Sequence, residues 1–198
     1  MDRKFNKGDI VQHFKREKMT DLSIYEDEVK KYLEEFMNKM EYIQYGWIDI
    51  NNKIHIKTIE NIKSLYRLAS IDEINEYKVG ICFDQVEYER FYFNDRFETH
   101  SYAIFSAHMM HAFLALKSDI GYIYFEHSSS KSRGIYYFKS MELLLKFAVD
   151  QYMIRHGIKD KSKVKLVPYD RLPDKITFKG IKELIMWNII IDIKWTKW

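Results

Sequence analysis

Apolar residues recur at intervals of three or four along much of the chain, which is the spacing of helices that bury one face. The clearest stretch begins at Asp21 or Ser23 and continues to about Met40. Ser70 and Glu73 have the spacing of a capping box, which predicts that a short helix begins there. In full, the pattern predicts helical segments over 21–40, 58–68, 70–77, 81–93, 140–156 and 181–193.

Other segments alternate apolar and polar residues, which is typical of strands. Residues 118–121 predict the turn of a hairpin, and Pro168 and Pro173 bracket another turn. Helices followed by antiparallel strands and again by helices predict the α+β class. The predicted strands are 5–14, 54–56, 99–106, 111–117, 121–127 and 135–138.

The organisation predicted from these elements is one domain over 1–198, because no linker rich in glycine and serine divides the chain. It comprises an N-terminal extension and helix (1–40), a core (41–138) and C-terminal helices (139–198). A chain of 198 residues with 46% hydrophobic residues can bury its own core. Its single cysteine excludes an internal disulfide and a four-cysteine zinc site.

The net charge does not alter the predicted fold class. A net charge of +3 is too small to indicate nucleic-acid binding by itself, so a nucleic-acid partner is not expected. The most basic stretch, 3–18, keeps that alternative open. We find no secretory signal at the start and no apolar stretch near the ~20 residues that span a bilayer, so the expectation is a cytoplasmic protein without a membrane partner.

The candidate chemistry begins at Cys82. Gly80 ends one predicted helix and Cys82 begins the next, where free N–H groups and the helix dipole favour a thiolate. A thiolate nucleophile also needs a base and a group that orients the base. His111 opens one predicted strand and Glu126 closes the next.

The hairpin brings these two residues together. Pairing around the turn at 118–121 places His111 opposite about position 127, and a shift of one residue places it opposite Glu126. A carboxylate so close to an imidazole fixes its tautomer and orientation. Cys82, His111 and Glu126 are therefore the predicted catalytic residues.

Three short sequence segments resemble those of a known protein family: GICFDQVEYER (Gly80 to Arg90), HAFLAL (His111 to Leu116) and YFEHS…RGI (Tyr124 to Ile135). With this order of cysteine, histidine and acid, residues 40–138 resemble the transglutaminase-like superfamily of papain-type cysteine enzymes, in particular a subgroup of small bacterial and phage proteins.

The resemblance implies a helix carrying the cysteine packed on an antiparallel sheet. It also implies hydrolysis or acyl transfer on amide bonds of a peptide or protein, through a thioester and without cofactor or metal. In that scheme Cys82 is the nucleophile, His111 the base and Glu126 the orienting acid.

The sequence departs from the usual pattern of the superfamily at two positions. Glu126 stands where aspartate is more common, and Phe113 stands where the aromatic residue after the catalytic histidine is usually tryptophan. The backbone N–H of Cys82 would be one oxyanion donor. The second donor is unassigned, with Tyr45 and Trp47 as candidates.

Two further alternatives remain open from the sequence. His108, His111, Glu126 and His127 are residue types that bind metal, although their spacing is a weak signal for such a site. An inactive domain of the same fold would instead bind a peptide or a partner protein. Phe113, Tyr122 and Tyr124 are expected to line the aromatic face of the site, although aromatic strand residues are more often core.

Overall fold

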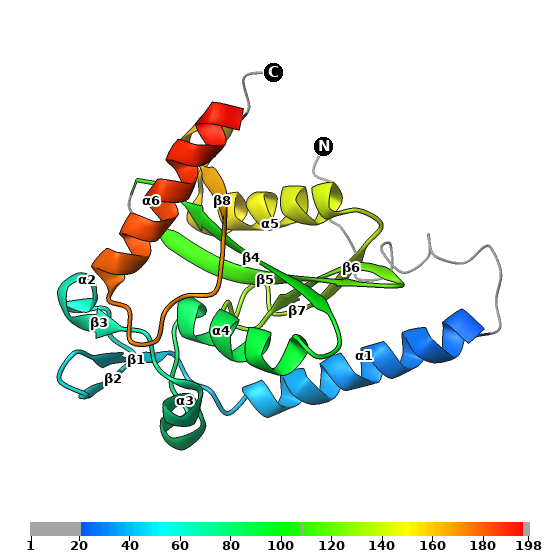
Figure 1. Cartoon of the computed structure of the whole chain (residues 1–198), viewed down its shortest axis with the longest axis horizontal. Helices are drawn as coiled ribbons and strands as arrows, with labels where there is room; N and C mark the ends of the chain where they lie inside the picture. The colour runs from blue at the N-terminus through cyan, green and yellow to red at the C-terminus, as the bar shows by residue number, and fades with distance from the viewer. Residues whose placement is uncertain (1–20, 108, 196–198) are drawn as a thin grey trace.

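The computed structural model of the protein describes residues 21–107 and 109–195, and it has the α+β architecture that the sequence predicts (Figure 1). The predicted strand at 5–14, the basic stretch 3–18 and His108 lie outside these described residues. The helices are α1 (Asp21–Met40), α2 (Ile62–Leu65), α3 (Ile71–Tyr77), α4 (Cys82–Phe93), α5 (Met141–His156) and α6 (Phe178–Trp195), with a 3-10 turn at Lys161–Lys163. The strands are β1 (Gly46–Asp49), β2 (Ile54–Ile56), β3 (Tyr66–Arg67), β4 (Glu98–Phe105), β5 (Met110–Ser118), β6 (Gly121–Glu126), β7 (Gly134–Phe138) and β8 (Lys165–Tyr169).

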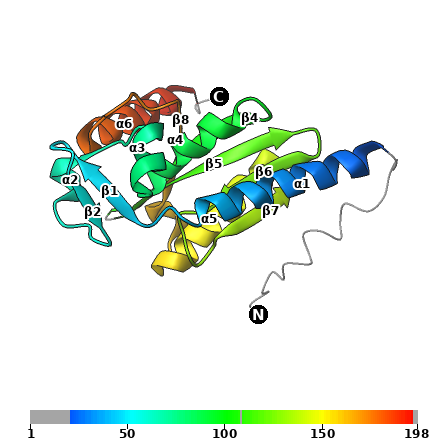
Figure 2. The same ribbon diagram turned by 90° about the horizontal axis from the view of Figure 1, so that it is seen from below.

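The main sheet has five antiparallel strands in the order β7-β6-β5-β4-β8, and a smaller sheet has the order β2-β1-β3. Helices cover both faces of the main sheet, with α4 on one side and α5 on the other (Figure 2). Alternation along β5 explains why both faces are apolar. Ala112, Leu114 and Leu116 join the cluster of α1 and α4, whereas Phe113 and Ala115 join the cluster of α5.

Most predicted helices are confirmed because their signals are local. Ser70 Oγ accepts the backbone N–H of Glu73, and the Glu73 side chain accepts the N–H of Ser70, which completes the predicted capping box of α3. Ser140 caps α5 in the same way through the N–H of Leu143.

The helix predicted over 58–68 is largely wrong. Only Ile62–Leu65 is helical, and Tyr66 and Arg67 instead pair with β1 as strand β3. Tertiary contacts override the local spacing at this point, because the buried guanidinium of Arg67 lies 2.6 Å from Glu73 Oε1. The extended backbone of β3 places the Arg67 side chain next to Glu73.

The prediction of C-terminal helices alone over 139–198 is also incomplete. Strand β8 lies in this region and pairs with β4 at the edge of the main sheet, from Ser101↔Tyr169 to Phe105↔Lys165. The sequence places Pro168 only at the border of a turn, whereas the structure places it within this strand. An edge strand accommodates a proline because one of its sides needs no ladder donor.

In the part of the chain that the structure describes, no helix combines the length and apolar character needed to cross a membrane.

Candidate active site

Cys82 is the first residue of α4 and is half-buried. The helix start is held by Asp84, whose carboxylate accepts the backbone N–H of Ile81 at 2.9 Å and thereby caps α4. The same carboxylate accepts the backbone N–H of Ala69 at 2.8 Å and the hydroxyl of Tyr66 at 2.9 Å. Asp84 therefore fixes the position of Cys82 relative to strand β3 and the loop that follows it.

Burial has a large effect on this carboxyl group. It raises the pKa of Asp84 to about 7, against the opposing effect of the hydrogen bonds from Ala69, Ile81 and Tyr66. A buried carboxyl group is unfavourable without hydrogen bonds, so Asp84 needs its three donors. The three buried donors in turn need Asp84 as their acceptor.

Replacing Asp84 with alanine is expected to lower the free energy of unfolding by about 3–5 kcal/mol, because it leaves three buried donors without an acceptor. Urea denaturation at pH 6 measures the loss. Asp72→Ala is the matched control, since Asp72 is an exposed acidic residue in the first turn of α3. Equal losses in the two variants would contradict the anchoring role of Asp84.

His111 and Glu126 lie side by side, as the sequence predicts. His111 Nε2 is 2.6 Å from Glu126 Oε2, and both side chains are buried. The predicted register is wrong by a small shift. The observed pairing Leu114↔Phe125, continued along the strands, places Phe113 opposite Glu126. His111 and Glu126 are therefore diagonal neighbours on one face, a separation that long side chains can bridge.

Glu126 is held by donors that were not predicted. Oε2 accepts the hydroxyl of Tyr124 at 2.7 Å, and Oε1 accepts the hydroxyl of Ser128 at 2.8 Å and the N–H of Ser129 at 2.9 Å. Burial alone would raise the pKa of Glu126. The charge of His111 and these hydrogen bonds outweigh it and lower the pKa to about 2.

The imidazole shows the complementary change. Burial alone would lower the pKa of His111. The charge of Glu126 and hydrogen bonds to Cys82 and Glu126 outweigh burial and raise the pKa to about 9. Because Nε2 faces Glu126, the other ring nitrogen is the one available to Cys82, which lines the same cleft. With the raised pKa, the His111 ring is protonated around neutral pH.

A cleft of about 430 Å³ opens onto Cys82 and His111. It lies where the first turn of α4 and the last turn of α5 reach the same end of the main sheet, so both sides of the sheet supply residues. From α5 come Arg155 and His156, and from the loop after β6 comes a run of three serines beginning at Ser128. Arg155 Nη2 lies 4.0 Å from Glu126 Oε2 and also donates to Ser132 Oγ.

The two candidates for the second oxyanion donor differ in position. Trp47 is fully buried, stacks on His55 and donates its indole N–H to the carbonyl of Thr58 at 2.8 Å, so it does not serve the cleft. Tyr45 lines the cleft. Burial and the nearby Cys82 raise the pKa of the Tyr45 hydroxyl, which keeps it protonated and able to donate.

The expected aromatic face is wrong for this cleft. Phe113 and Tyr124 are fully buried in the cluster beneath α5, where their rings pack edge to face at 5.0 Å. Tyr122 packs against the same cluster. These aromatic residues support the strands that carry His111 and Glu126 but do not line the opening.

Two buried polar residues near the site were missed by sequence reasoning. Gln85 donates to the carbonyl of Gly80 at 3.0 Å and contacts His127 Nδ1 through Oε1 at 2.9 Å, which joins α4 to the end of β6. Burial and then Arg133 lower the pKa of His127 to about 4, so this ring is neutral. Glu89 lies two helical turns after Cys82, where burial, Glu126 and Cys82 raise the pKa of its carboxyl group far above the usual range.

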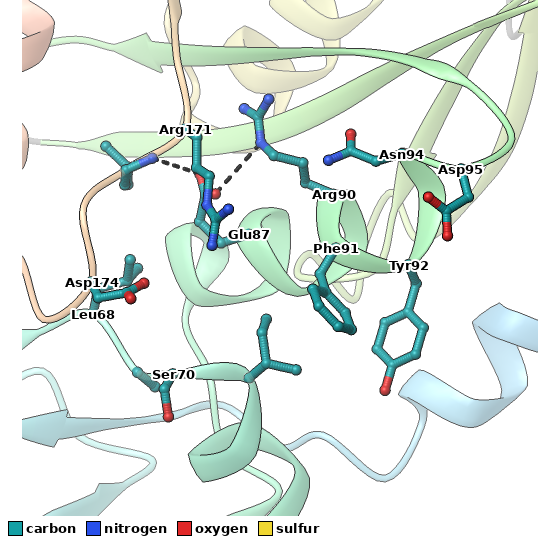
Figure 3. Close-up of a pocket in the computed structure, with 13 residues that line it drawn as sticks. Leu68, Ser70, Glu87, Arg90, Phe91, Tyr92, Asn94, Asp95, Arg171 and Asp174 are labelled. Carbon is teal, nitrogen blue, oxygen red and sulfur yellow. Dashed lines mark hydrogen bonds and ion pairs between the residues drawn. The ribbon is translucent and has the colours of Figure 1, made fainter.

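A second hollow of about 380 Å³ lies along the C-terminal half of α4, away from Cys82 (Figure 3). Its central feature is Glu87, which lies between the guanidinium of Arg90 at 3.5 Å and the backbone N–H of Leu172 at 3.3 Å. These contacts tie α4 to the segment that follows β8. The charge of Glu87 thus stabilises the packing of α4 against this segment.

The proposed metal alternative receives no support from the described positions. Among residues 21–107 and 109–195, no three histidine, cysteine, aspartate or glutamate side chains are grouped so that they could hold an ion. His108 lies outside the described residues. Of the other residues considered for that site, His111 is paired with Glu126, and His127 Nδ1 contacts Gln85.

Comparisons with known proteins do not assign this chain to a family or a function. No protein-family model matches the chain, and no curated protein matches it significantly.

Proposed function

We propose that this protein is a cysteine-dependent hydrolase or acyltransferase with a transglutaminase-like, papain-type core, and that it acts on amide bonds. The observation that carries the proposal is that a cysteine at a helix start and a histidine paired with a buried carboxylate line one cleft. These groups occur in the chain order of the resemblance, with His111 on β5 and Glu126 on the neighbouring strand β6.

The chemistry follows from the charges of these groups. The Cys82 thiolate attacks the carbonyl carbon, a C–S bond forms, and the negative charge moves to the carbonyl oxygen. The backbone N–H of Cys82 and the Tyr45 hydroxyl are the donors proposed for that oxygen. His111 gives its proton to the amine as the C–N bond breaks, which leaves a thioester on Cys82.

The second half-reaction regenerates the enzyme. Neutral His111 takes a proton from water, or from an acceptor amine, as that molecule attacks the thioester carbonyl. The C–S bond breaks and the thiolate returns beside the imidazolium. Glu126 keeps the ring oriented through both steps and stabilises its charge.

The proposal predicts an unusually reactive thiol. At pH 6 an ordinary cysteine with a pKa of about 8.5 is less than about 1% thiolate. Native Cys82 is expected to react with iodoacetamide at this pH about 10- to 100-fold faster than the same residue in the denatured chain. Intact-mass measurements over time give both rate constants, and because the chain has one cysteine, every thiol adduct is on Cys82.

A second readout follows the acyl step directly. Incubation with p-nitrophenyl acetate is expected to add one acetyl group to Cys82 and then release it, whereas Cys82→Ser should form no thioester. If the thiol reacts only after denaturation and no acetyl adduct forms, the enzyme proposal fails. That result would favour the alternative of an inactive domain that binds a peptide or protein.

A further inference from the structure

The cleft at Cys82 continues into a neighbouring hollow of about 180 Å³. The two share four lining residues, Lys63, Met109, Met110 and Phe178, so they form one elongated groove. The second part runs along α6 as far as Ile185 and Met186. An elongated groove with the cysteine in one of its two parts suits an extended chain better than a compact small molecule.

The charged residues of the groove all carry one sign. Lys63, Lys131 and Arg155 line the part at Cys82, and Lys182 lines the part at α6. Among the described residues that line either part, none is aspartate or glutamate. Glu126 lies behind His111 and is fully buried, where its charge is matched by the imidazolium.

These cations are available to a ligand. Within the described ranges, no carboxylate lies within ion-pair distance of the three lysines, and all three are exposed. Arg155 is bound on one side by Ser132 and Glu126, but its buried Nε–H has no hydrogen-bond partner. His156 adds no charge at neutral pH, because burial, Arg155 and His111 lower the pKa of its ring.

The rest of the groove is apolar and mixes aliphatic, methionine and aromatic side chains, the aromatic ones being Tyr45, Phe83, Phe105 and Phe178. Ile59 and Met109 are 67% and 46% exposed and line the same cleft, so they present apolar surface to a ligand there. Ile62, Met110 and Phe178 lie beside them and are half-buried. Methionine side chains adapt to partners of different shapes, so this part of the groove suits an apolar side chain of variable form.

We propose that the acyl donor is a peptide segment with a carboxylate side chain next to an apolar side chain, bound along this groove with its reacting carbonyl at Cys82. The inference rests on the proposed function for its chemistry, and it adds the substrate class. A nucleic acid also carries negative charge, but its recognition relies on stacking of bases on aromatic rings. The groove has aromatic lining residues, but aliphatic and methionine side chains outnumber them, which favours an apolar side chain over a stacked base.

The test compares two alkylating agents of similar size and different charge. Iodoacetate is anionic and iodoacetamide is neutral, so the ratio of their rate constants at Cys82 reports the potential in the groove. The double variant Lys63→Glu/Lys131→Glu is expected to lower this ratio about five- to tenfold at low salt, and because both agents react with the same thiolate, a change in the thiolate fraction cancels in the ratio. Raising the ionic strength should lower the ratio of the wild type towards that of the variant.

The control is Lys31→Glu/Lys146→Glu, which changes the net charge equally at exposed positions outside the groove. It should leave the ratio close to the wild-type value. Equal ratios in wild type and groove variant, with rapid iodoacetamide reaction, would reject the substrate class and retain the nucleophile. A slow iodoacetamide reaction in the wild type would reject both.

Protection of Cys82 from iodoacetamide then identifies the ligand. A short peptide of glutamate and leucine with blocked ends is expected to protect at concentrations at least tenfold lower than the same peptide with glutamine in place of glutamate. Equal protection by the two peptides overturns the proposal. Stronger protection by a 12-nucleotide single strand also overturns it, in favour of a nucleic-acid ligand.

Discussion

Replacing His111 with glutamine is expected to slow iodoacetamide alkylation of Cys82 at pH 6 by about 10- to 100-fold, to the rate of the denatured chain. Turnover of an acetyl thioester should fall further, by about 10²- to 10⁴-fold, because the general acid and base of both half-reactions is lost. The reason is electrostatic as well as chemical. The raised pKa keeps His111 protonated around neutral pH, and the proposal requires this cation beside the nucleophile.

Glutamine is chosen because it keeps a hydrogen-bond donor for the buried Glu126 carboxylate, which alanine would remove, although both variants lose the counter-charge. Removing one member of a buried pair costs about 3–5 kcal/mol and would confuse loss of chemistry with loss of fold. A glutamine amide at position 111 has a donor for Glu126 Oε2 but carries no ionisable proton. Circular dichroism and the urea midpoint establish that the variant is folded before rates are compared.

His100→Gln is the matched control, because His100 lies on β4 of the same sheet and pairs with Glu98 rather than with the site. It should alkylate at the wild-type rate. Wild-type reactivity in His111→Gln would show that the thiol is not activated by His111, and the proposed role of the imidazole would be abandoned.

The sequence predicts those parts of the fold that depend on neighbours in the chain. Capping residues Ser70 and Ser140 mark helix starts because their hydroxyls bond to backbone N–H groups three residues later. The start of α4 at Cys82 follows similarly from the glycine before it. Strands β3 and β8 could not be predicted in this way, since their partners β1 and β4 lie far away in sequence.

The same distinction between residues close in sequence and residues brought together by packing applies to the candidate site. His111 and Glu126 belong to one hairpin, so a turn of four residues was enough to bring them together, and even the shift in register left them in contact. Arg155 reaches the site from the end of α5, and Tyr45 comes from the segment before β1. No local spacing relates these residues to Cys82. They are brought there by packing on both faces of the main sheet.

The aromatic residues of the strands show that the sequence pattern alone does not distinguish a core position from a position in the site. Phe113 and Tyr124 lie two residues from catalytic candidates and on the same face of the sheet, yet they are covered by α5 and belong to the core. Tyr124 contributes indirectly, because its hydroxyl bonds to Glu126. The exposed aliphatic residues Ile59 and Met109 line the cleft instead.

Replacing Glu126 with glutamine is expected to lower the free energy of unfolding by about 3–5 kcal/mol between pH 4.5 and 6.5, because the buried imidazolium loses its counter-charge. The pKa values define this window. The pKa of Glu126 is lowered to about 2, so its stabilisation is present above its unfolded value of about 4.5 and is lost as the pH falls towards 2. The pKa of His111 is raised to about 9, so its stabilisation is complete below about 6.5 and is lost as the pH rises through 9.

The measurement is urea denaturation of both proteins from pH 4 to pH 10. Asp84 has a pKa raised to about 7, so its contribution falls with rising pH. It does so in both proteins and cancels in their difference. That difference should be largest between pH 4.5 and 6.5 and should shrink as His111 loses its proton above neutral pH. Glu98→Gln, which alters an exposed partner of Lys117 on the same sheet, should leave the free energy of unfolding nearly unchanged at every pH. A difference for Glu126→Gln that does not vary with pH would mean that Glu126 acts through hydrogen bonding alone, without an ion pair to His111.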